Sequence, residues 1–484
     1  MVFILRYFSC IALALMLVSC AGRVPTDTIR ASLASGNLDS LEKEMEKTHE
    51  SYGEMVTALN LARIHQLNGH WKESINAYTE ALISLEEYEK RAIINAREIA
   101  STVGTIFFSR GARSYFGAGY ERSLLHTLNS LNYAMLGDFT GAAVEMRRME
   151  ERQTLWLDES QARIEKYLHE KSAIDSPDNL PQAYSMRDIL RNDDVRRLVN
   201  NYQDPFSYAL GAVFFRLADD MPAAEVSMRR AAALDENANL LFTGFSPPVT
   251  PNLPEAQKKT GKKKTSPSSS PPEAAAPAAF PEISPNSGLQ EVTVIAFTGL
   301  APALYVENIR VWIPPIGSIL IDLPAYKEAV QGASLTARDS TGTPLTFYPL
   351  LKTDLLAYRT LWDEVRLEWS FAASRAITRA GAAAGTYILA SSNDNTRAFA
   401  SLISSATSLL MDLFAQAMSG SVRNWETLPN AGFLAMTHVP RGGSVTIGAH
   451  GAEKEISLPP DARGVIIMAT EIAHSTMRIY YVAY

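Results

Sequence analysis

The fold of this chain is decided by a repeated pattern, and its clearest copy reads GDFTGAAVEMRRM at positions 137–149. Gly137 breaks one helix, the small side chain of Ala142 lets two helices approach closely, and Met146 fills the groove between them. The same offsets occur from Gly69 and from Asp219. These three copies predict three helix pairs that stack into one array.

These repeats resemble tetratricopeptide repeats. The first two turns lie 137 − 69 = 68 residues apart, which is twice the 34-residue period of that family. The resemblance implies that proteins or peptides bind along the concave face of the first helices. In this register, the concave face is expected to hold Arg63, Gln66, Thr127 and Arg216. Two arginines on such a face would bind a carboxylate group.

Four further blocks resemble a family of uncharacterised bacterial outer-membrane lipoproteins. They read YER at 120–122, DPFSY at 204–208, GLAP at 299–302 and RNWETLP at 423–429, so the resemblance spans most of the chain. It implies no particular activity, but it makes the stretch 120–153 a second candidate partner-binding surface. A helix hairpin that needs those contacts only for folding is the alternative. The candidate residues of this stretch are Tyr120, Glu121, Glu145, Arg147 and Arg148.

The N-terminus has the pattern of an export signal. Arg6 precedes an apolar run at 7–18, which is too short to span a bilayer. The run ends in LVSC at 17–20, which resembles the lipobox of bacterial lipoproteins. This implies removal of residues 1–19 and attachment of fatty acyl chains (palmitate among them) to Cys20. Because Ala21 rather than Asp follows the cysteine, the anchor resembles those sent to the outer membrane, facing the periplasm. An ordinary secretory signal is the alternative.

A change in composition at 246–288 predicts two domains. This stretch is rich in Pro, Ser, Ala and Lys and is expected to be a disordered linker. Its lysines are expected to be solvated, and contact with headgroups or cell-wall polymers is the alternative. The linker would separate an all-α domain at 20–245 from a β-rich domain at 289–484. The formal net charge of −7 gives no reason to expect a nucleic-acid partner.

The β-rich half combines short β-branched runs with two helical segments. Strands are predicted at 292–297, 309–313, 318–323, 433–437, 444–447, 465–469 and 477–483, the last being central or barrel-closing. A helical hairpin at 363–418 is predicted as an insertion, close-packed through GAAAG at 381–385, with membrane insertion as the alternative. The fold class is therefore α+β, with helical repeats first and then a β-sandwich or partial barrel.

No catalytic motif stands out in the sequence. The closest pair of histidines, His65 and His70, is five residues apart, which does not place both on one helix face, so neither a metal site nor a cofactor is expected. His126 is expected to be buried in the core, and Glu145 and Arg148 are spaced to pair on one helix face.

The main functional hypothesis is a non-enzymatic scaffold that binds envelope proteins or peptides. Two alternatives stay open. One is a regulator of peptidoglycan synthesis, by analogy with synthase-activating lipoproteins that carry tetratricopeptide-like domains. The other is an enzyme acting on glycan or lipid through a carboxylate pair that assembles from distant positions.

Overall fold

The computed structural model describes residues 24–52, 55–95, 115, 117–169, 180–245, 288–313, 317–365, 424–472 and 477–484. Several predictions fall outside these residues: the export signal with Cys20, the linker up to residue 287, and most of the helical hairpin at 363–418. Of that hairpin only 363–365 are described, and they belong to a helix that begins ten residues earlier than predicted, at Thr353.

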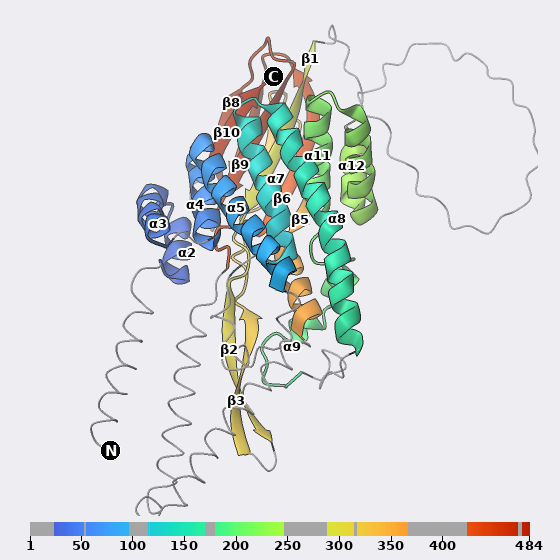
Figure 1. Cartoon of the computed structure of the whole chain (residues 1–484). Helices are drawn as coiled ribbons and strands as arrows, with labels where there is room; N and C mark the ends of the chain where they lie inside the picture. Colours follow the sequence, from blue (N-terminus) through green and yellow to red (C-terminus); the bar gives the residue numbers. More distant parts are fainter. Residues whose placement is uncertain are drawn as a thin grey trace, which may run out of the picture.

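The first half of the chain is helical (Figure 1). Two helices, α2 (Thr26–Ala34) and α3 (Leu38–Tyr52), precede three helix hairpins. Short helices α9 (Arg187–Leu190) and α10 (Asp193–Arg197) precede the third hairpin, and α13 (Glu236–Gly244) follows it. The hairpins are α4 (Met55–Asn68) with α5 (Trp71–Asn95), α7 (Gly119–Met135) with α8 (Phe139–His169), and α11 (Pro205–Leu217) with α12 (Met221–Leu234).

The three hairpins turn in the same way. The backbone takes a positive φ at Gly69 (78°), Gly137 (79°) and Asp219 (59°), a conformation that favours glycine and that aspartate tolerates better than most residues. The small residue five positions later in each copy is fully buried between the paired helices, as the pattern requires. The three predicted helix pairs are therefore present, and their kinship with tetratricopeptide repeats stays a prediction.

The second half forms three groups of strands. A five-stranded sheet has the order β10-β9-β1-β6-β5, in which β1 runs parallel to β9 and antiparallel to β6. A three-stranded sheet has the order β4-β7-β8, and β2 and β3 form a separate hairpin. The strands are β1 (Leu289–Thr298), β2 (Leu304–Ile313), β3 (Gly317–Tyr326), β4 (Thr336–Asp339), β5 (Tyr348–Lys352), β6 (Ala431–Pro440), β7 (Ser444–Ala449), β8 (Ala452–Ser457), β9 (Gly464–Glu471) and β10 (Arg478–Ala483).

The prediction for the last strand was wrong. β10 pairs only with β9 and lies at the edge of the five-stranded sheet, so it is neither central nor barrel-closing. On one of its faces Tyr480 and Val482 pack against the core shared with the helices. On the other face Ile479 is buried in the sandwich, whereas Tyr481 and Ala483 are exposed, as is common in an edge strand.

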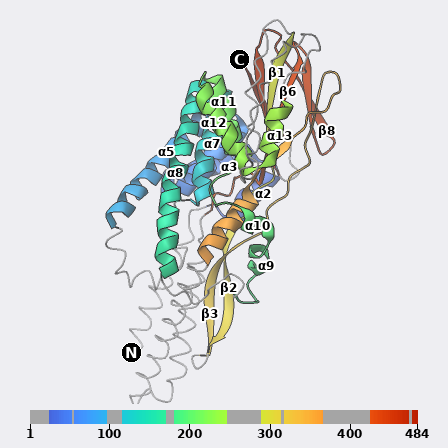
Figure 2. The same ribbon diagram turned by 90° about the vertical axis from the view of Figure 1, so that its right-hand side faces the viewer.

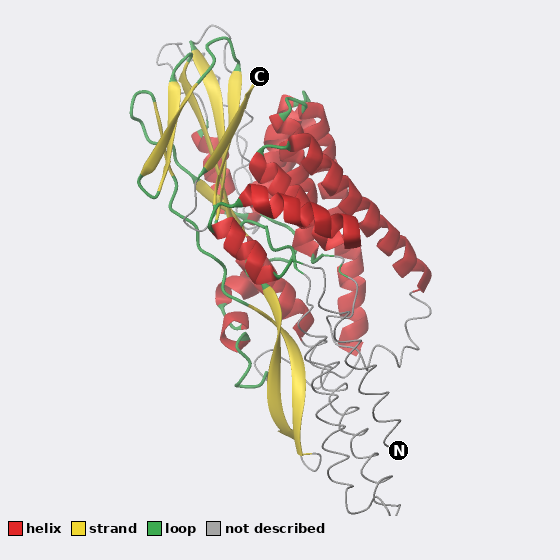
Figure 3. Cartoon of the chain, turned by 90° about the vertical axis from the view of Figure 1, so that its left-hand side faces the viewer, coloured by secondary structure: helices red, strands yellow, loops and turns green. Residues whose placement is uncertain are grey.

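The five-stranded sheet is the middle of three layers. Val292 and Val294 of β1 pack toward the three-stranded sheet, whereas Ile295 and Phe297 belong to the cluster that includes the helices. Figures 2 and 3 show most of the helices on one side of this sheet and the three-stranded sheet on the other. The fold class is α+β with helices first, and of the two β architectures predicted the sandwich is the one formed.

The two halves share one hydrophobic core, which corrects the prediction of two separate domains. A single cluster joins Leu59, Leu128 and Phe214 of the helices to Phe297 and Met468 of the strands. The composition change near residue 246 therefore separates helices from strands, but it does not separate two cores. Among the described helices, none is both long and apolar enough to cross a membrane.

Candidate functional site

The inner face of the helix pairs, predicted to bind partners, is covered by the second half of the chain. Arg63, Gln66 and Thr127 are all buried, with at most 1% of each residue exposed. Arg216 is nearly as enclosed, with 10% of its side chain exposed. These four residues do not form an open groove, so the predicted partner site on this face was wrong.

Arg63 lies between the helices and the sheet. Its guanidinium stands 5.2 Å from the centre of the Phe297 ring on β1 and donates a hydrogen bond to Gln66. Burial lowers the pKa of Arg63 to about 10. Gln66 in turn donates to the carbonyl oxygen of Leu128 and to Oδ1 of Asn132, each at 2.7 Å. These polar side chains tie α4 to α7 and to the sheet.

Arg216 and Thr127 make similar internal contacts. Arg216 forms a two-pronged ion pair with Glu291 on β1, one arm of which is 2.9 Å long. Such a geometry fixes both orientation and distance between a helix and a strand. The hydroxyl of Thr127 lies 2.8 Å from that of Ser207, which joins α7 to α11. Each predicted ligand-binding residue therefore binds a group of the chain itself.

A short stretch at 424–430 fills the part of the inner face next to α4, α5 and α7. The Trp425 ring is fully buried and packs edge-on against Tyr78, with ring centres 6.0 Å apart. Its backbone N–H donates to Glu121 at 3.4 Å, and the N–H of Thr427 donates to Asn60 at 3.2 Å. Backbone groups held by helix side chains are what a repeat array offers a bound peptide, and here the peptide belongs to the same chain.

Two buried carboxyl groups meet at this stretch. Glu426 accepts a hydrogen bond of 2.9 Å from Thr26 and lies 3.8 Å from Arg30. Burial raises the pKa of Glu426 to about 7, against the opposing effect of these partners, and Glu121 raises it further. Burial likewise raises the pKa of Glu121, although that group accepts a hydrogen bond from the Ala118 N–H. Both side chains are enclosed by protein, which is unlike the open cleft that glycan hydrolysis requires.

The 120–153 stretch is also mostly internal. Tyr120, Glu121 and Glu145 are buried, so they are not surface contacts as predicted. Glu145 lies 2.8 Å from Nδ1 of His126 and 2.6 Å from Arg148, which confirms the predicted burial of His126 and the predicted pairing on one helix face. Of the five candidate residues only Arg147 and Arg148 reach the surface.

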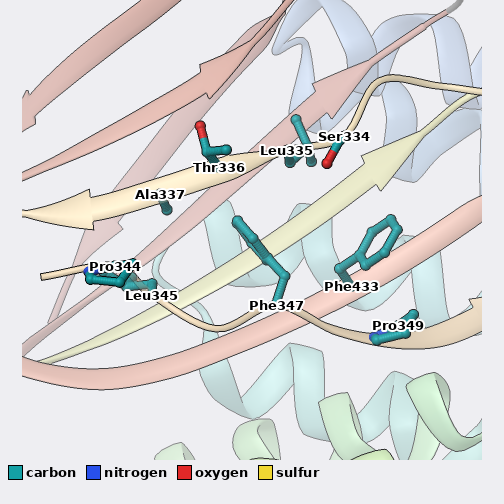
Figure 4. Close-up of a pocket in the computed structure, with 9 residues that line it drawn as sticks. All are labelled: Ser334, Leu335, Thr336, Ala337, Pro344, Leu345, Phe347, Pro349 and Phe433. Atoms are coloured by element: carbon teal, nitrogen blue, oxygen red, sulfur yellow. The ribbon is translucent and has the colours of Figure 1, made fainter.

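A pocket of about 430 Å³ lies on the sandwich rather than on the helices. Figure 4 shows it lined by Leu335, Leu345, Phe347 and Phe433 with small neighbours, none of them titratable. Its lining can bind an apolar group, and among the lining residues no acid or base accompanies the hydroxyls of Ser334 and Thr336.

The β2–β3 hairpin is a feature that the sequence did not mark as functional. It extends away from the body (Figures 1 and 3), and Trp312 near its end is 69% exposed. Its base is tied to the first described helix: Lys327 pairs with Asp27 at 2.9 Å, and Arg30 donates to the carbonyl oxygen of Ala301 at 2.8 Å. Ile309, Ile321 and Leu323 of the hairpin are buried in the shared core, whereas Trp312 toward its end is exposed.

The structure brings together two histidines that the sequence analysis had kept apart, in a cluster that could hold a metal ion. Because α4 ends at Asn68 and Gly69 reverses the chain, His65 and His70 do not lie on one continuous helix. Both imidazoles approach Glu42 of α3, and the three ligand atoms lie within 4.8 Å of one another. The five-residue spacing that argued against a shared helix face therefore does not prevent a shared site.

Comparison with known proteins adds no relative: no family model, no curated protein and no solved structure matches the chain.

Proposed function

We propose that this protein is a lipid-anchored scaffold of the bacterial envelope, held against a membrane by acyl chains on Cys20 and by the β2–β3 hairpin. In this role the helix pairs and the sheet form one rigid body, and other envelope proteins bind the outer face of the helices. The observation that carries the proposal is the uncharged end of the hairpin with the exposed Trp312, on a hairpin whose base is tied to the first described helix.

The end of the hairpin has the composition of a membrane contact. Between Arg310 and Asp322 the sequence contains no charged residue. Trp312, which is mostly exposed, belongs to the residue type enriched where protein crosses the boundary between water and lipid. Paired with Ser318 across the hairpin, it would place its ring in the headgroup region, with Arg310 above it in water.

The dimensions of the anchor and the hairpin agree. Six peptide units separate Cys20 from Thr26, and a chain of that length spans about 20 Å at most. The ten residues of β2 extend over about 33 Å. A hairpin directed at the bilayer therefore reaches roughly 10 Å past the anchored cysteine. That excess corresponds to the last three residues of the strand, Val311, Trp312 and Ile313, which follow the last charge.

The outer face of the helix pairs is the surface left for partners. The chain itself covers the inner face, whereas about half of each of the Arg147 and Arg148 side chains is exposed on α8. The hairpin, as a second membrane contact beside the acyl chains, would hold this face at a fixed height and orientation above the bilayer, since one anchor alone leaves the body free to rotate.

Membrane contact by the hairpin can be tested without the lipid. The chain from residue 20 with Cys20→Ser would be mixed with vesicles of phosphatidylethanolamine and phosphatidylglycerol and sedimented. We expect Trp312→Ser to reduce the bound fraction several-fold, because it removes the exposed aromatic ring. Tyr481→Ser, which removes a half-exposed aromatic ring from the edge of the sheet, is the matched control and should bind as the parent does. Equal binding by the Trp312 variant and the parent would overturn the role of the hairpin.

A further inference from the structure

We infer that Glu42, His65 and His70 form a binding site for a divalent transition metal ion of the zinc type, with one coordination position open to solvent. The three residues come from three separate places: helix α3, the last turn of α4, and the turn that leads into α5. This site is independent of the membrane contact proposed above.

The ligand atoms converge on one point. Nδ1 of His65 lies 2.5 Å and Nδ1 of His70 lies 2.8 Å from the same oxygen, Oε1 of Glu42. The two rings are 6.3 Å apart between centres and inclined by 52°, so they approach the carboxylate from different sides. An ordinary histidine–glutamate ion pair contains one imidazole. Here two imidazoles approach the same carboxylate oxygen, so three possible metal ligands lie together.

The donor set fits zinc. Two imidazole nitrogens and one carboxylate oxygen form a set found in zinc sites that keep a fourth position for water or another ligand. Bonds of about 2.0–2.2 Å to a tetrahedral ion place neighbouring ligand atoms roughly 3.3 Å apart. Each imidazole nitrogen would therefore move less than about 1 Å away from Oε1 of Glu42 as the metal replaces the shared protons. His70, half exposed in a short turn, has the freedom to make that movement.

Neighbouring groups hold the carboxylate and favour a cation. Nδ2 of Asn68 donates a 2.9 Å hydrogen bond to Oε2 of Glu42, which leaves Oε1 directed at the imidazoles. Such a second partner orients a metal-binding carboxylate. Asp39 and Glu73 lie close enough to attract positive charge at His70. The local charge is therefore negative, as a dication requires.

The last strand of the chain stabilises the turn that carries His70. The hydroxyl of Tyr480 donates to the carbonyl oxygen of Leu67 at 3.0 Å, and its ring packs edge-on against Trp71 at 5.0 Å. A β-carbon at Gly69 would lie only 2.8 Å from the Tyr480 ring. The turn is thus fixed before any metal binds, and Trp71 next to His70 gives an optical signal at the site.

The experiment is a titration of the metal-free chain from residue 20 with Zn²⁺ by calorimetry, and with Co²⁺ by visible absorption. We expect one ion per chain, a Co²⁺ spectrum typical of tetrahedral nitrogen and oxygen ligands, and a change in Trp71 fluorescence. His70→Ala should weaken Zn²⁺ binding at least tenfold. Loss of a residue that only hydrogen-bonds to a metal ligand already lowers metal affinity by about 10–100-fold, and His70 is itself a ligand. This variant alters an exposed side chain, so folding should be retained.

The matched control is His49→Ala, which removes an imidazole from the other histidine–glutamate contact on α3, with Glu80. It should leave the affinity unchanged. Glu42→Gln keeps the shape of the side chain but removes the anionic ligand, and should weaken binding as His70→Ala does. Equal Zn²⁺ affinity in the parent and His70→Ala would overturn the site, as would an affinity that falls only in His49→Ala.

Discussion

Two pairs of arginines, one on α4 and α11 and the other on α8, show how differently the two faces of the helical array are used. Arg63 and Arg216 point inward, with 1% of the first residue and 10% of the second side chain exposed. Arg147 and Arg148 point outward, with 47% and 54% of their side chains exposed. Arg63 and Arg216 lie on α4 and α11, the first helices of their pairs, and contact the sheet. Arg147 and Arg148 lie on α8, the second helix of its pair, whose outer side the sheet does not cover.

Burial changes what these charges contribute to the stability of the fold. A guanidinium removed from water destabilises the fold unless aromatic, polar or acidic groups compensate. Phe297 and Gln66 compensate Arg63, and Glu291 compensates Arg216. The outer arginines keep most of their hydration, and exposed ion pairs contribute at most about 1 kcal/mol. The same residue type therefore holds two layers together on one face. On the other face it forms exposed ion pairs, Arg147 with Asp220 and Arg148 with Glu145, which leave about half of each side chain accessible to a partner.

The largest effect should come from reversing an inner charge. Arg216→Glu would place a carboxylate opposite Glu291 in a buried position, and we expect a loss of about 3–5 kcal/mol in the free energy of unfolding. Urea denaturation measures it. Arg147→Glu is the matched control on the outer face. Combining Arg216→Glu with Glu291→Arg should recover part of the loss, and an unchanged denaturation midpoint in the single variant would contradict the role of this pair.

Cutting the chain between the halves should come next. A protease site inserted near Lys262 would be cleaved in the purified protein, and we expect the fragments to elute together, because one hydrophobic core joins them. The separate 289–484 fragment should lack a cooperative thermal transition, since its sheet would expose the face that the helices normally cover. Fragments that separate without denaturant, each with its own transition, would restore the view of two independent domains.

Acidity should change stability through Glu426. Burial raises its pKa from 4.5 to about 7 in the folded chain. The folded state therefore binds a proton more readily than the unfolded state. The free energy of unfolding should fall as pH rises from about 4.5 to about 7, by up to about 3 kcal/mol from this group.

The check is urea denaturation of the parent and of Glu426→Gln at pH 5 and pH 8. The variant carries no charge to bury, so its stability should change less between the two pH values. Identical changes in both proteins would show that another group is responsible.

The smallest effect on stability should come from the outer arginines. Arg147→Ala and Arg148→Ala should each change the free energy of unfolding by no more than about 1 kcal/mol. Partner binding should depend on them far more. A photo-crosslinking residue at position 148 should trap an envelope protein in intact cells, whereas the same residue at the exposed position 454 on β8 should not. The identity of the trapped protein would distinguish a general scaffold from a regulator of cell-wall synthesis.

Local patterns in the sequence predicted much of the architecture. Fixed offsets from Gly69, Gly137 and Asp219 predicted three helix pairs. The turn residue, the small residue between the helices and the residue that fills the groove lie close together in the sequence, so a local pattern reveals them. Runs of β-branched residues predicted seven of the ten strands, and only β4, β5 and β8 were missed. The contact of Glu145 with Arg148 could be predicted because a spacing of three residues brings two side chains onto the same face of a helix.

What the sequence by itself determined is therefore the kind and order of the elements: helix pairs first, then strands. Only the tertiary structure decided which faces are covered. Arg216 meets Glu291 and Thr427 meets Asn60 through contacts between residues far apart in the chain, which periodicity does not report. His65 and His70 share Glu42 because Gly69 turns the backbone between them. A local pattern specifies which residues lie on one face of a helix. Which other segment packs against that face depends on how the whole chain buries its apolar surface.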